Sequence, residues 1–424
     1  MRVRIFLIRT ILLKYILQVM LRHIISNIRY PATKFRLLYV FCYASWLSWI
    51  PFFGLYLKEQ NMGGSQIGYV SSLIWIVMLI FQPLWGILAD KYGRISCFKV
   101  SIIISSLLLL AFFFVSKSLI AIVLCTIFCS LFFITIQPLL DTLVLDYISK
   151  EKTKLTYSSL RFWGAIGACI GSQTTSILMN KFSINFIFII AAFYLLCCIP
   201  FTFKLIERNN KNSMKMEFKN INTLFSDKIL MIFLLIIVCV SITQTSIWYY
   251  ITIYLKDIGA SDYIAGSAIT IDAISELPFY FLAIFLFRRF GLRFTILVAF
   301  FVTSGRLLLY AHNDLPVAVL AIELFHGISW TLMWLATVEY INYLVKPEWR
   351  ATGQSLLWAA YYGAGQILGN VWVGFLYENN SMQFIYGING VIVFILSIAT
   401  CLIFFKMKNM KTKHLFRTEG GYRV

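Results

Sequence analysis

The chain has 424 residues and a formal net charge of +19, with 60% hydrophobic and only 13% charged residues. Its mean hydropathy of +0.81 lies far above that of globular domains, so the composition excludes a soluble protein. Nucleic-acid binding is excluded as well, because the basic residues lie in short loops between apolar segments and not on a solvated face beside a soluble core. The composition predicts a polytopic membrane protein.

The sequence lacks the patterns of a soluble enzyme. Its nine Cys all lie in apolar segments, where they behave as small hydrophobic residues, and their spacing predicts neither disulfides nor a zinc site. The four His form no His-Glu-x-x-His pattern, and no P-loop or dinucleotide fingerprint is present. We therefore expect no enzymatic activity, no metal and no cofactor.

Residues 1–33 form a basic segment ahead of the apolar spans. Polar side chains recur at four-residue spacing, at Thr10, Lys14, Gln18, Arg22 and Ser26. This stripe predicts a basic amphipathic helix on the membrane surface. Its charges argue against a further span, and a signal peptide is not expected because Arg9 and Lys14 interrupt the apolar run. An alternative is that translation begins at Met20.

Long apolar segments follow at a regular interval. A bilayer core about 30 Å thick needs roughly 20 apolar residues per helix. The sequence predicts twelve such helices, and therefore an all-α membrane protein. They lie near residues 36–57, 67–89, 96–116, 119–146, 158–180, 184–204, 229–255, 263–287, 294–311, 316–344, 352–377 and 383–405.

The longest internal polar stretch, residues 207–228, divides the spans six and six. We expect it to link an N-terminal bundle, residues 34–206, to a C-terminal bundle, residues 229–406, which a basic tail at 407–424 follows. Gly pairs at four-residue spacing let helix backbones approach closely. One occurs in the fifth span and one in the eleventh, at Gly167 and Gly171 and at Gly365 and Gly369. They indicate a duplication, although a Gly-rich helix can also produce them by chance.

Lys and Arg gather on one side of the predicted spans. The opposite side holds only Lys58, Lys117, Lys181 and Lys256. Because positively charged loops stay in the cytoplasm, both termini and the linker are predicted to be cytoplasmic.

The segment GILADKYGR, residues 86–94, joins the second and third spans. Asp90 can cap a helix end there, while Lys91 and Arg94 contact carbonyl groups or acids across a moving interface. The loop resembles the signature of the major facilitator superfamily, matched by Gly86, Leu88, Ala89, Asp90, Gly93 and Arg94. The segment FRRFGLR keeps Gly291 and Arg293 of a decayed second copy. The resemblance implies two six-helix bundles that rock about a central site, with residues 86–94 as a gating loop.

Several ionisable residues lie within the spans, where each costs about 2.5–3.5 kcal/mol if it faces lipid. They must line a cavity or form pairs. In the C-terminal half, helical spacing and comparable depth predict one polar cluster of Asp272, Glu276, Arg306, Glu323 and His326. In the N-terminal half, Asp141 and Arg161 can pair across the hairpin between the fourth and fifth spans.

Two interpretations of these charges are open. They can be satisfied ion pairs that hold helices together, which we favour for Asp146 and Glu339 near the cytoplasmic ends. For the C-terminal cluster we favour function, because a carboxylate beside a His and an Arg in a partly dry cavity has a movable pKa, as a proton carrier needs.

The same residues resemble a narrower branch of the superfamily, that of the lactose and phenylpropionate permeases. The segments PLLDTL and LRFWGAIG place Asp141 and Arg161 on the paired substrate residues of that branch. The segments SELP, SGRLLL and LFHG place Glu276, Arg306 and His326 on its acid, Arg and His, which implies proton coupling.

The chain departs from that branch at two positions. Ser329 stands where the branch has a carboxylate after its His. We expect Glu323 to take the role of that carboxylate in proton coupling. Ala168 stands where the branch has a sugar-stacking Trp, so galactoside transport is not expected. Trp163 is the candidate that replaces it by stacking on a solute ring.

Other polar and aromatic residues in the spans are weaker candidates. Gln137 and Gln244 are the further candidates for solute binding. Interfacial anchoring and helix packing explain most membrane Trp residues. Trp46 and Trp334 are the stronger candidates among them for lining a cavity.

The leading hypothesis is a monomeric transporter of the cell membrane, surrounded by lipid, that takes up a sugar, nucleoside or aromatic acid together with protons. Asp141 and Arg161 would bind the solute, the C-terminal cluster would carry the proton, and the proton gradient would supply the energy. One alternative is an exporter that works by proton antiport, although GACIGSQTTS in the fifth span lacks the Gly-Pro that such exporters usually carry. A second is a membrane sensor or structural protein that moves no solute.

Overall fold

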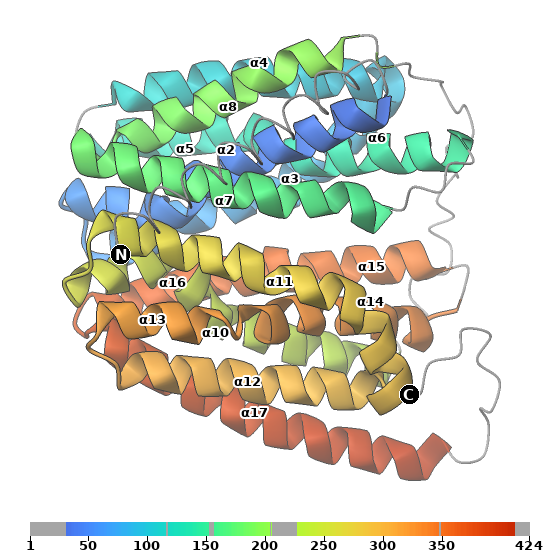
Figure 1. The fold of residues 1–424 in the computed structure, drawn as a ribbon. Helices are drawn as coiled ribbons and strands as arrows, with labels where there is room; N and C mark the ends of the chain where they lie inside the picture. The colour runs from blue at the N-terminus through green and yellow to red at the C-terminus, as the bar shows by residue number, and fades with distance from the viewer. Residues whose placement is uncertain are drawn as a thin grey trace, which may run out of the picture.

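The chain folds into two side-by-side groups of long helices (Figure 1). The structure is a computed structural model that describes residues 31–115, 118–151, 157–203, 205, 227–346 and 349–411. Residues 1–30 of the predicted surface helix therefore lie outside the described residues, as do most of the linker and the end of the basic tail, whereas residues 31–33 belong to α2.

The first group crosses the membrane six times. Its helices are α2 (Pro31–Glu59), α3 (Gly64–Tyr92), α4 (Arg94–Phe113), α5 (Leu119–Phe133) with α6 (Ile136–Glu151), α7 (Tyr157–Lys181) and α8 (Phe186–Thr202). The fourth crossing is broken between α5 and α6, where a single helix is expected from the sequence. The break has a local cause, because Pro138 has no N–H to donate to the carbonyl of Ile134.

The second group also crosses six times. Its helices are α10 (Lys228–Asp257), α11 (Asp262–Phe290), α12 (Leu292–Ala311), α13 (Pro316–Glu323) with α14 (Met333–Leu344), α15 (Arg350–Trp358) with α16 (Gln366–Tyr377), and α17 (Met382–Lys411). A π-helical segment, η2 (Gly327–Leu332), leads into α14, and another, η4 (Ala359–Gly365), joins α15 to α16. We call the end where α8 stops and α10 starts the linker side.

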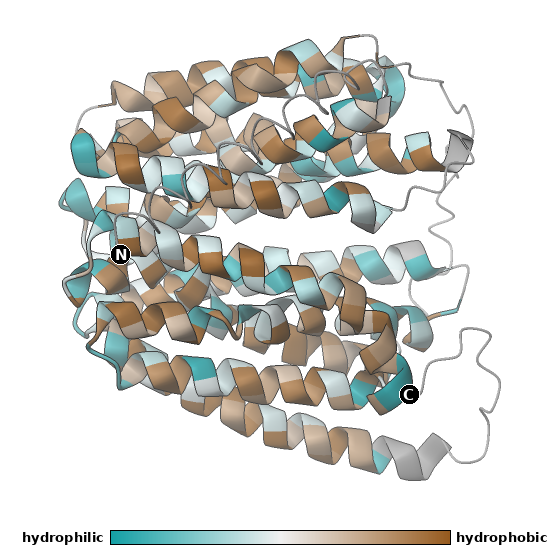
Figure 2. Ribbon diagram, in the orientation of Figure 1, coloured by the Kyte–Doolittle hydropathy of each residue, from teal (hydrophilic) through white to brown (hydrophobic). Residues whose placement is uncertain are grey.

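The surface of both groups suits a lipid environment. Nine helical segments among the described residues are long and apolar enough to cross a membrane, and α8 is a shorter apolar helix. Hydrophobic residues run along most of the helix lengths, and hydrophilic residues are frequent near the helix ends (Figure 2). Large apolar side chains such as Phe281 and Leu402 are exposed at 71% and 65%. The predicted fold of twelve transmembrane helices in two six-helix bundles is confirmed.

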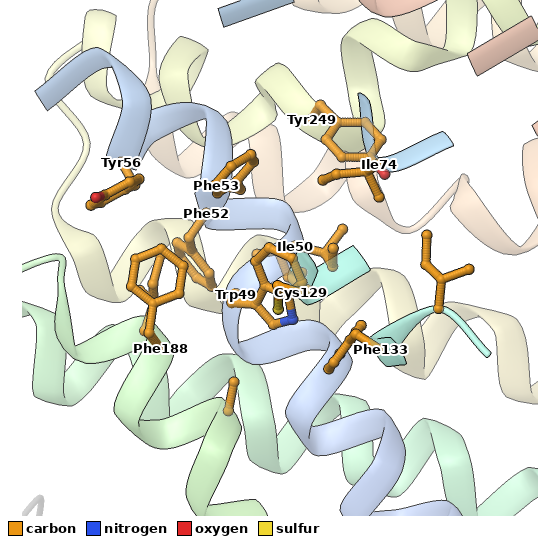
Figure 3. Packing of buried hydrophobic residues seen from close by; sticks show 14 of the residues in the cluster. Trp49, Ile50, Phe52, Phe53, Tyr56, Ile74, Cys129, Phe133, Phe188 and Tyr249 are labelled. Carbon is orange, nitrogen blue, oxygen red and sulfur yellow. The ribbon is translucent and has the colours of Figure 1, made fainter. Parts of the chain in front are cut away.

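Aromatic side chains fill the core of the N-terminal bundle (Figure 3). Trp49 of α2 lies edge-on to Phe133 of α5, with ring centroids 5.1 Å apart. Further along the same face of α2, Tyr56 meets Phe188 of α8 at 4.8 Å, and Phe188 stacks on Phe112 of α4 at 4.4 Å. Trp49 is fully buried in this packing, so it anchors the bundle and lines no cavity.

The Gly pairs predicted from the sequence occupy equivalent seams in the two bundles. A Cβ atom on Gly167 of α7 would lie 2.1 Å from the Val40 carbonyl oxygen of α2. A Cβ atom on Gly369 of α16 would lie 2.1 Å from Thr245 Oγ1 of α10. The fifth span thus packs on the first as the eleventh packs on the seventh. This correspondence supports an internal duplication.

Candidate solute and proton site

Arg306 of α12 is the centre of a buried polar cluster in the C-terminal bundle. Its guanidinium forms an ion pair with Glu323 of α13 and lies 3.4 Å, from Nη2 to Oδ1, from Asp272 of α11. It also donates to Ser329 Oγ at 2.8 Å and to the Tyr310 hydroxyl at 2.9 Å. Arg306 is 2% exposed and Glu323 is fully buried. The predicted cluster therefore forms, and Ser329 takes part in it as a hydrogen-bond acceptor.

His326 connects this arginine to the remaining acid of the cluster. Its Nδ1 lies 3.1 Å from Arg306 Nη1 and 3.3 Å from Asp272 Oδ1. Its Nε2 lies 3.2 Å from Glu276 Oε1, and the Tyr280 hydroxyl donates to Glu276 Oε2 at 2.9 Å. Because arginine only donates hydrogen bonds, a neutral His326 accepts at Nδ1 and keeps its proton on Nε2, toward Glu276.

The cluster carries more acids than bases. The carboxyl groups of Asp272, Glu276 and Glu323 surround one guanidinium and one imidazole. Among the described residues, Glu323 Oε1 is buried and has no hydrogen-bond partner. An unpaired ionised oxygen is costly in a buried position, whereas a protonated carboxyl group is neutral. The composition of the cluster thus favours binding of at least one proton.

A second, more open group lies in the N-terminal bundle. The Tyr39 hydroxyl donates to Asp141 Oδ1 at 2.6 Å, and Arg161 Nη1 lies 3.5 Å from Asp141 Oδ2. Arg161 also donates to the Tyr157 hydroxyl at 2.7 Å and lies over the Tyr43 ring. The side chains of Arg161 and Asp141 are 31% and 24% exposed. Their long contact and exposure leave donors and acceptors for a further ligand.

The two groups approach each other where the bundles meet. Helix α7 packs along α11, and Ser172 Oγ lies 2.8 Å from Thr270 Oγ1. The Tyr280 hydroxyl interacts electrostatically with both Arg161 and Glu276, and so does that of Tyr362. Arg161 of the N-terminal bundle and Glu276 of the C-terminal bundle therefore both act on the hydroxyl groups of Tyr280 and Tyr362. One molecule bound between the bundles can thus interact with both charged groups.

The weaker sequence candidates have different surroundings. Gln137 is partly buried, and its Oε1 has no hydrogen-bond partner within the described part of the chain. Trp163 lies under the guanidinium of Arg36, 5.8 Å from the ring centroid. Gln244 is buried inside the C-terminal bundle, where it accepts from the Tyr361 hydroxyl at 2.6 Å and donates to Thr303 Oγ1 at 3.3 Å. These contacts give Gln244 a packing role, and we remove it from the proposed solute site.

The loop expected at residues 86–94 is helical except at Gly93, because α3 extends to Tyr92 and α4 begins at Arg94. The side chains of this segment connect three helices. Arg94, at the start of α4, pairs with Asp146 of α6 and lies 3.4 Å from Asp90 of α3. Lys91 lies over the Tyr92 ring. Gly93 has a φ of 95°, which favours glycine, and Gly291 has a φ of 87° at the equivalent turn of the second bundle. A Cβ atom on Gly86 would meet nothing within 4 Å, so no close packing explains that glycine.

The sequence analysis missed the tyrosines that complete both groups. Tyr157, Tyr280 and Tyr310 each lie four residues from the charged partner that they contact on the same helix. That i,i+4 spacing is a signal that the sequence contains. Tyr39 contacts Asp141 from a helix 102 residues away, and no local pattern indicates that pair.

Polar contacts join the bundles on the side opposite the linker. Lys58 of α2 pairs with Asp257 of α10, and the Tyr377 hydroxyl donates to the same carboxylate at 2.9 Å. The Ser65 amide donates to Glu378 Oε2 at 2.7 Å. These contacts hold the two bundles together at that end.

Removing the Lys58–Asp257 pair is expected to open the bundles on this side. Lys58→Met removes the charge but keeps a long apolar side chain. Spin labels on unnatural amino acids at positions 60 and 380 should then show a larger population at long distance. Lys256→Met is the matched control, because Lys256 pairs with Asp262 within one bundle. Equal distance distributions for the two variants and the wild-type protein would contradict the role of the pair.

Comparison with known proteins gives a consistent result. The profile of the MFS_1 like family matches residues 32–388. The uncharacterized transporter YwbF of Bacillus subtilis is 28% identical over 380 residues, which cover 89% of this chain and 93% of YwbF. The maltose permease of Geobacillus stearothermophilus is 25% identical over 362 residues, 84% of this chain and 90% of the permease.

A solved structure supports the same fold. The crystal structure of the nucleoside transporter NupG aligns with a TM-score of 0.78 at 20% identity, covering 88% of this chain and 99% of NupG. The family match agrees with the fold of twelve helices. It also agrees with the presence of a charged group in each bundle. The chain belongs to the MFS_1 like family and is a multi-pass membrane transporter of the major facilitator superfamily.

Proposed function

We propose that the protein is a proton-coupled symporter that takes up a small ring-bearing organic solute by alternating access. The observation that carries this proposal is the buried cluster of three carboxyl groups around Arg306 and His326. Such a cluster is most stable when it holds an extra proton, and it lies beside the open pair of Asp141 and Arg161. A maltose permease and a nucleoside transporter among the similar proteins support a sugar or nucleoside as solute.

The geometry of His326 supports a route for the proton. Glu276 and Asp272 are the water-accessible acids of the cluster, since their side chains are 17% and 19% exposed whereas that of Glu323 is fully buried, and Glu276 is the one that faces His326 Nε2. A proton on Glu276 neutralises the acid that faces His326 Nε2. When the imidazole itself becomes protonated, Nδ1 can no longer accept from Arg306 and can donate to Asp272 instead. Proton binding would thereby change the partners of Arg306.

The solute is proposed to bind between Asp141 and Arg161 on one side and Glu276 and Tyr280 on the other. Gln137 and Trp163 are secondary contacts at the edge of this site. Arg161 is shared between Asp141 and Tyr157. A solute hydroxyl or carboxylate that binds Arg161 would replace part of these contacts. Neutralising Glu276 would then lower the cost of closing the bundles around the solute.

The segment at residues 86–94, which is the end of α3 and the turn into α4, is proposed to gate the linker side. Its Arg94 connects α3, α4 and α6 through two acids, so these helices move as one unit while the pairs persist. We propose that Gly86, Asp90, Lys91, Gly93 and Arg94 form this gate. We also propose that the protein is a monomer of the cell membrane, with both termini and the linker at residues 207–228 in the cytoplasm.

Transport in proteoliposomes with an imposed pH gradient tests the proposal. Labelled maltose, uridine and phenylpropionate represent the sugar, nucleoside and aromatic-acid classes. A symporter accumulates its solute when the outside is acidic, and a protonophore abolishes the accumulation. Accumulation that requires an acidic interior would favour the antiport exporter. Solute equilibration that does not respond to the gradient would remove proton coupling, and absence of any flux would favour a sensor or structural protein.

A further inference from the structure

Six aromatic residues from four helical crossings meet between the bundles, and we call them the aromatic wall. They are Trp75, Trp248, Trp330, Trp334, Trp358 and Tyr362. Trp75 and Trp358 both stack on Tyr362, with centroid distances of 5.4 and 4.6 Å. Trp330 and Trp334 stack on each other at 5.5 Å. The wall thus includes Trp75 from the N-terminal bundle, and its other members come from the C-terminal bundle.

The backbone under the wall is unusual. Trp330 lies on the π-helical segment η2, and Tyr362 lies on the π-helical segment η4. Such segments are rare and occur frequently at functional sites. Trp330 and Tyr362 are only partly buried, and Trp358 is 38% exposed. Residues whose only role is core packing need neither the irregular backbone nor the exposed ring area.

The wall adjoins both charged groups. Tyr362 interacts electrostatically with Arg161 and Glu276. At the other end, Trp248 lies edge-on to His326, with centroids 5.4 Å apart, and edge-on to Trp330 at 5.1 Å. A solute ring that binds on the wall therefore lies within reach of Asp141 and Arg161. It also contacts residues that pack against His326.

We propose that the wall binds a planar aromatic or heteroaromatic ring of the solute, so that the transported class is ring-bearing acids or nucleosides and not simple saccharides. This inference rests on the proposed function, whose solute site it extends. Saccharides carry hydroxyl groups on most edges, and each needs a hydrogen-bond partner when it leaves water. Five of the six rings of the wall, all except the buried Trp75, are at least partly exposed, and the wall has few polar atoms. Planar rings gain by stacking on such faces, while their polar substituent binds Arg161.

An aromatic ring of the solute that binds on the wall also links solute binding to proton binding. Within the wall, Trp248 contacts Trp330, and it also contacts His326 of the proton site. A solute ring that moves Trp330 therefore changes the packing on the imidazole. Binding of the solute and binding of the proton are then coupled through one indole, and each favours the other.

Binding to the full-length protein in lipid nanodiscs, without a pH gradient, tests the wall. The probes are uridine, phenylpropionate, xylose and maltose. We expect the wild-type protein to bind at least one of the two aromatic probes more tightly than either saccharide. Trp330→Leu and Tyr362→Leu should each weaken that binding by about 10-fold or more, since stacking of one ring contributes roughly this much. Tyr362→Phe keeps the ring and should retain most of the affinity.

Phe294→Leu is the matched control, because Phe294 is an aromatic residue at an exposed position of α12, where its ring contacts that of Phe290 at a tilt. Its binding should equal that of the wild-type protein. Three results would overturn the proposal that the wall binds the solute ring. They are preference of the wild-type protein for a saccharide, binding of neither aromatic probe, and unchanged affinity in both Leu variants. Failure of the proposed function can be distinguished from failure of ring binding. If only the proposed function fails, the pH gradient has no effect on transport, while the Leu variants still lose ring binding.

Discussion

Glu276→Gln is expected to abolish proton-driven accumulation while solute still exchanges across the membrane. Glutamine copies the size and neutrality of a protonated glutamic acid, so Tyr280 and His326 keep a hydrogen-bonding neighbour. The variant cannot release a proton, however. Transport down a solute gradient and exchange of labelled for unlabelled solute should persist, because neither requires residue 276 to change its charge. Accumulation against a gradient should fall to simple equilibration.

Proteoliposomes allow accumulation and exchange to be measured on the same preparation. Glu339→Gln is the matched control, since Glu339 is an acid on α14 that lies within a transmembrane span but outside the cluster. It should accumulate solute as the wild-type protein does. Full accumulation in Glu276→Gln would show that Glu276 does not carry the transported proton. Loss of both accumulation and exchange would show instead that Glu276 is needed to bind the solute.

The number and approximate bounds of the helices could be predicted because each depends on a local property. A run of about 20 apolar residues must cross the bilayer as a helix whatever its neighbours are. The Gly pairs and the charged pairs were also predictable, since helical spacing and depth place Arg306 beside Glu323 and His326. These features require no knowledge of how the helices pack.

Features that depend on packing between helices could not be predicted. A glutamine that lines a cavity cannot be told from one that is buried between helices by sequence alone. Only the contacts of Gln244 with Tyr361 and Thr303 show that it is buried inside one bundle. The π-helical segments depend on neighbours in the same way. A Cβ atom on Gly327 would lie 2.1 Å from the Ser275 carbonyl oxygen, so η2 begins where α11 approaches its backbone most closely.

Asp141→Asn is expected to weaken solute binding by roughly 10- to 100-fold and to leave proton coupling of the remaining transport unchanged. Hydrogen bonds to a charged group contribute about 1.5–3 kcal/mol, which corresponds to that range of affinity. In the wild-type protein, Arg161 is shared between a long contact of 3.5 Å with Asp141 and a hydrogen bond of 2.7 Å to the Tyr157 hydroxyl. Without the carboxylate, Tyr157 alone holds the guanidinium, and Arg161 is expected to present it less well to the solute.

Tyr39→Phe separates the two roles of Asp141, because it removes the 2.6 Å hydrogen bond that orients the carboxylate but keeps the charge. Its effect on solute binding should be smaller than that of Asp141→Asn, because the carboxylate keeps its charge and its contact with Arg161. In the double variant the two losses should not add, since Tyr39 acts on the solute only through Asp141. Isothermal titration at two pH values checks this. Additive losses would show that Tyr39 and Asp141 contact the solute independently, and the proposed positioning of Arg161 would then be wrong.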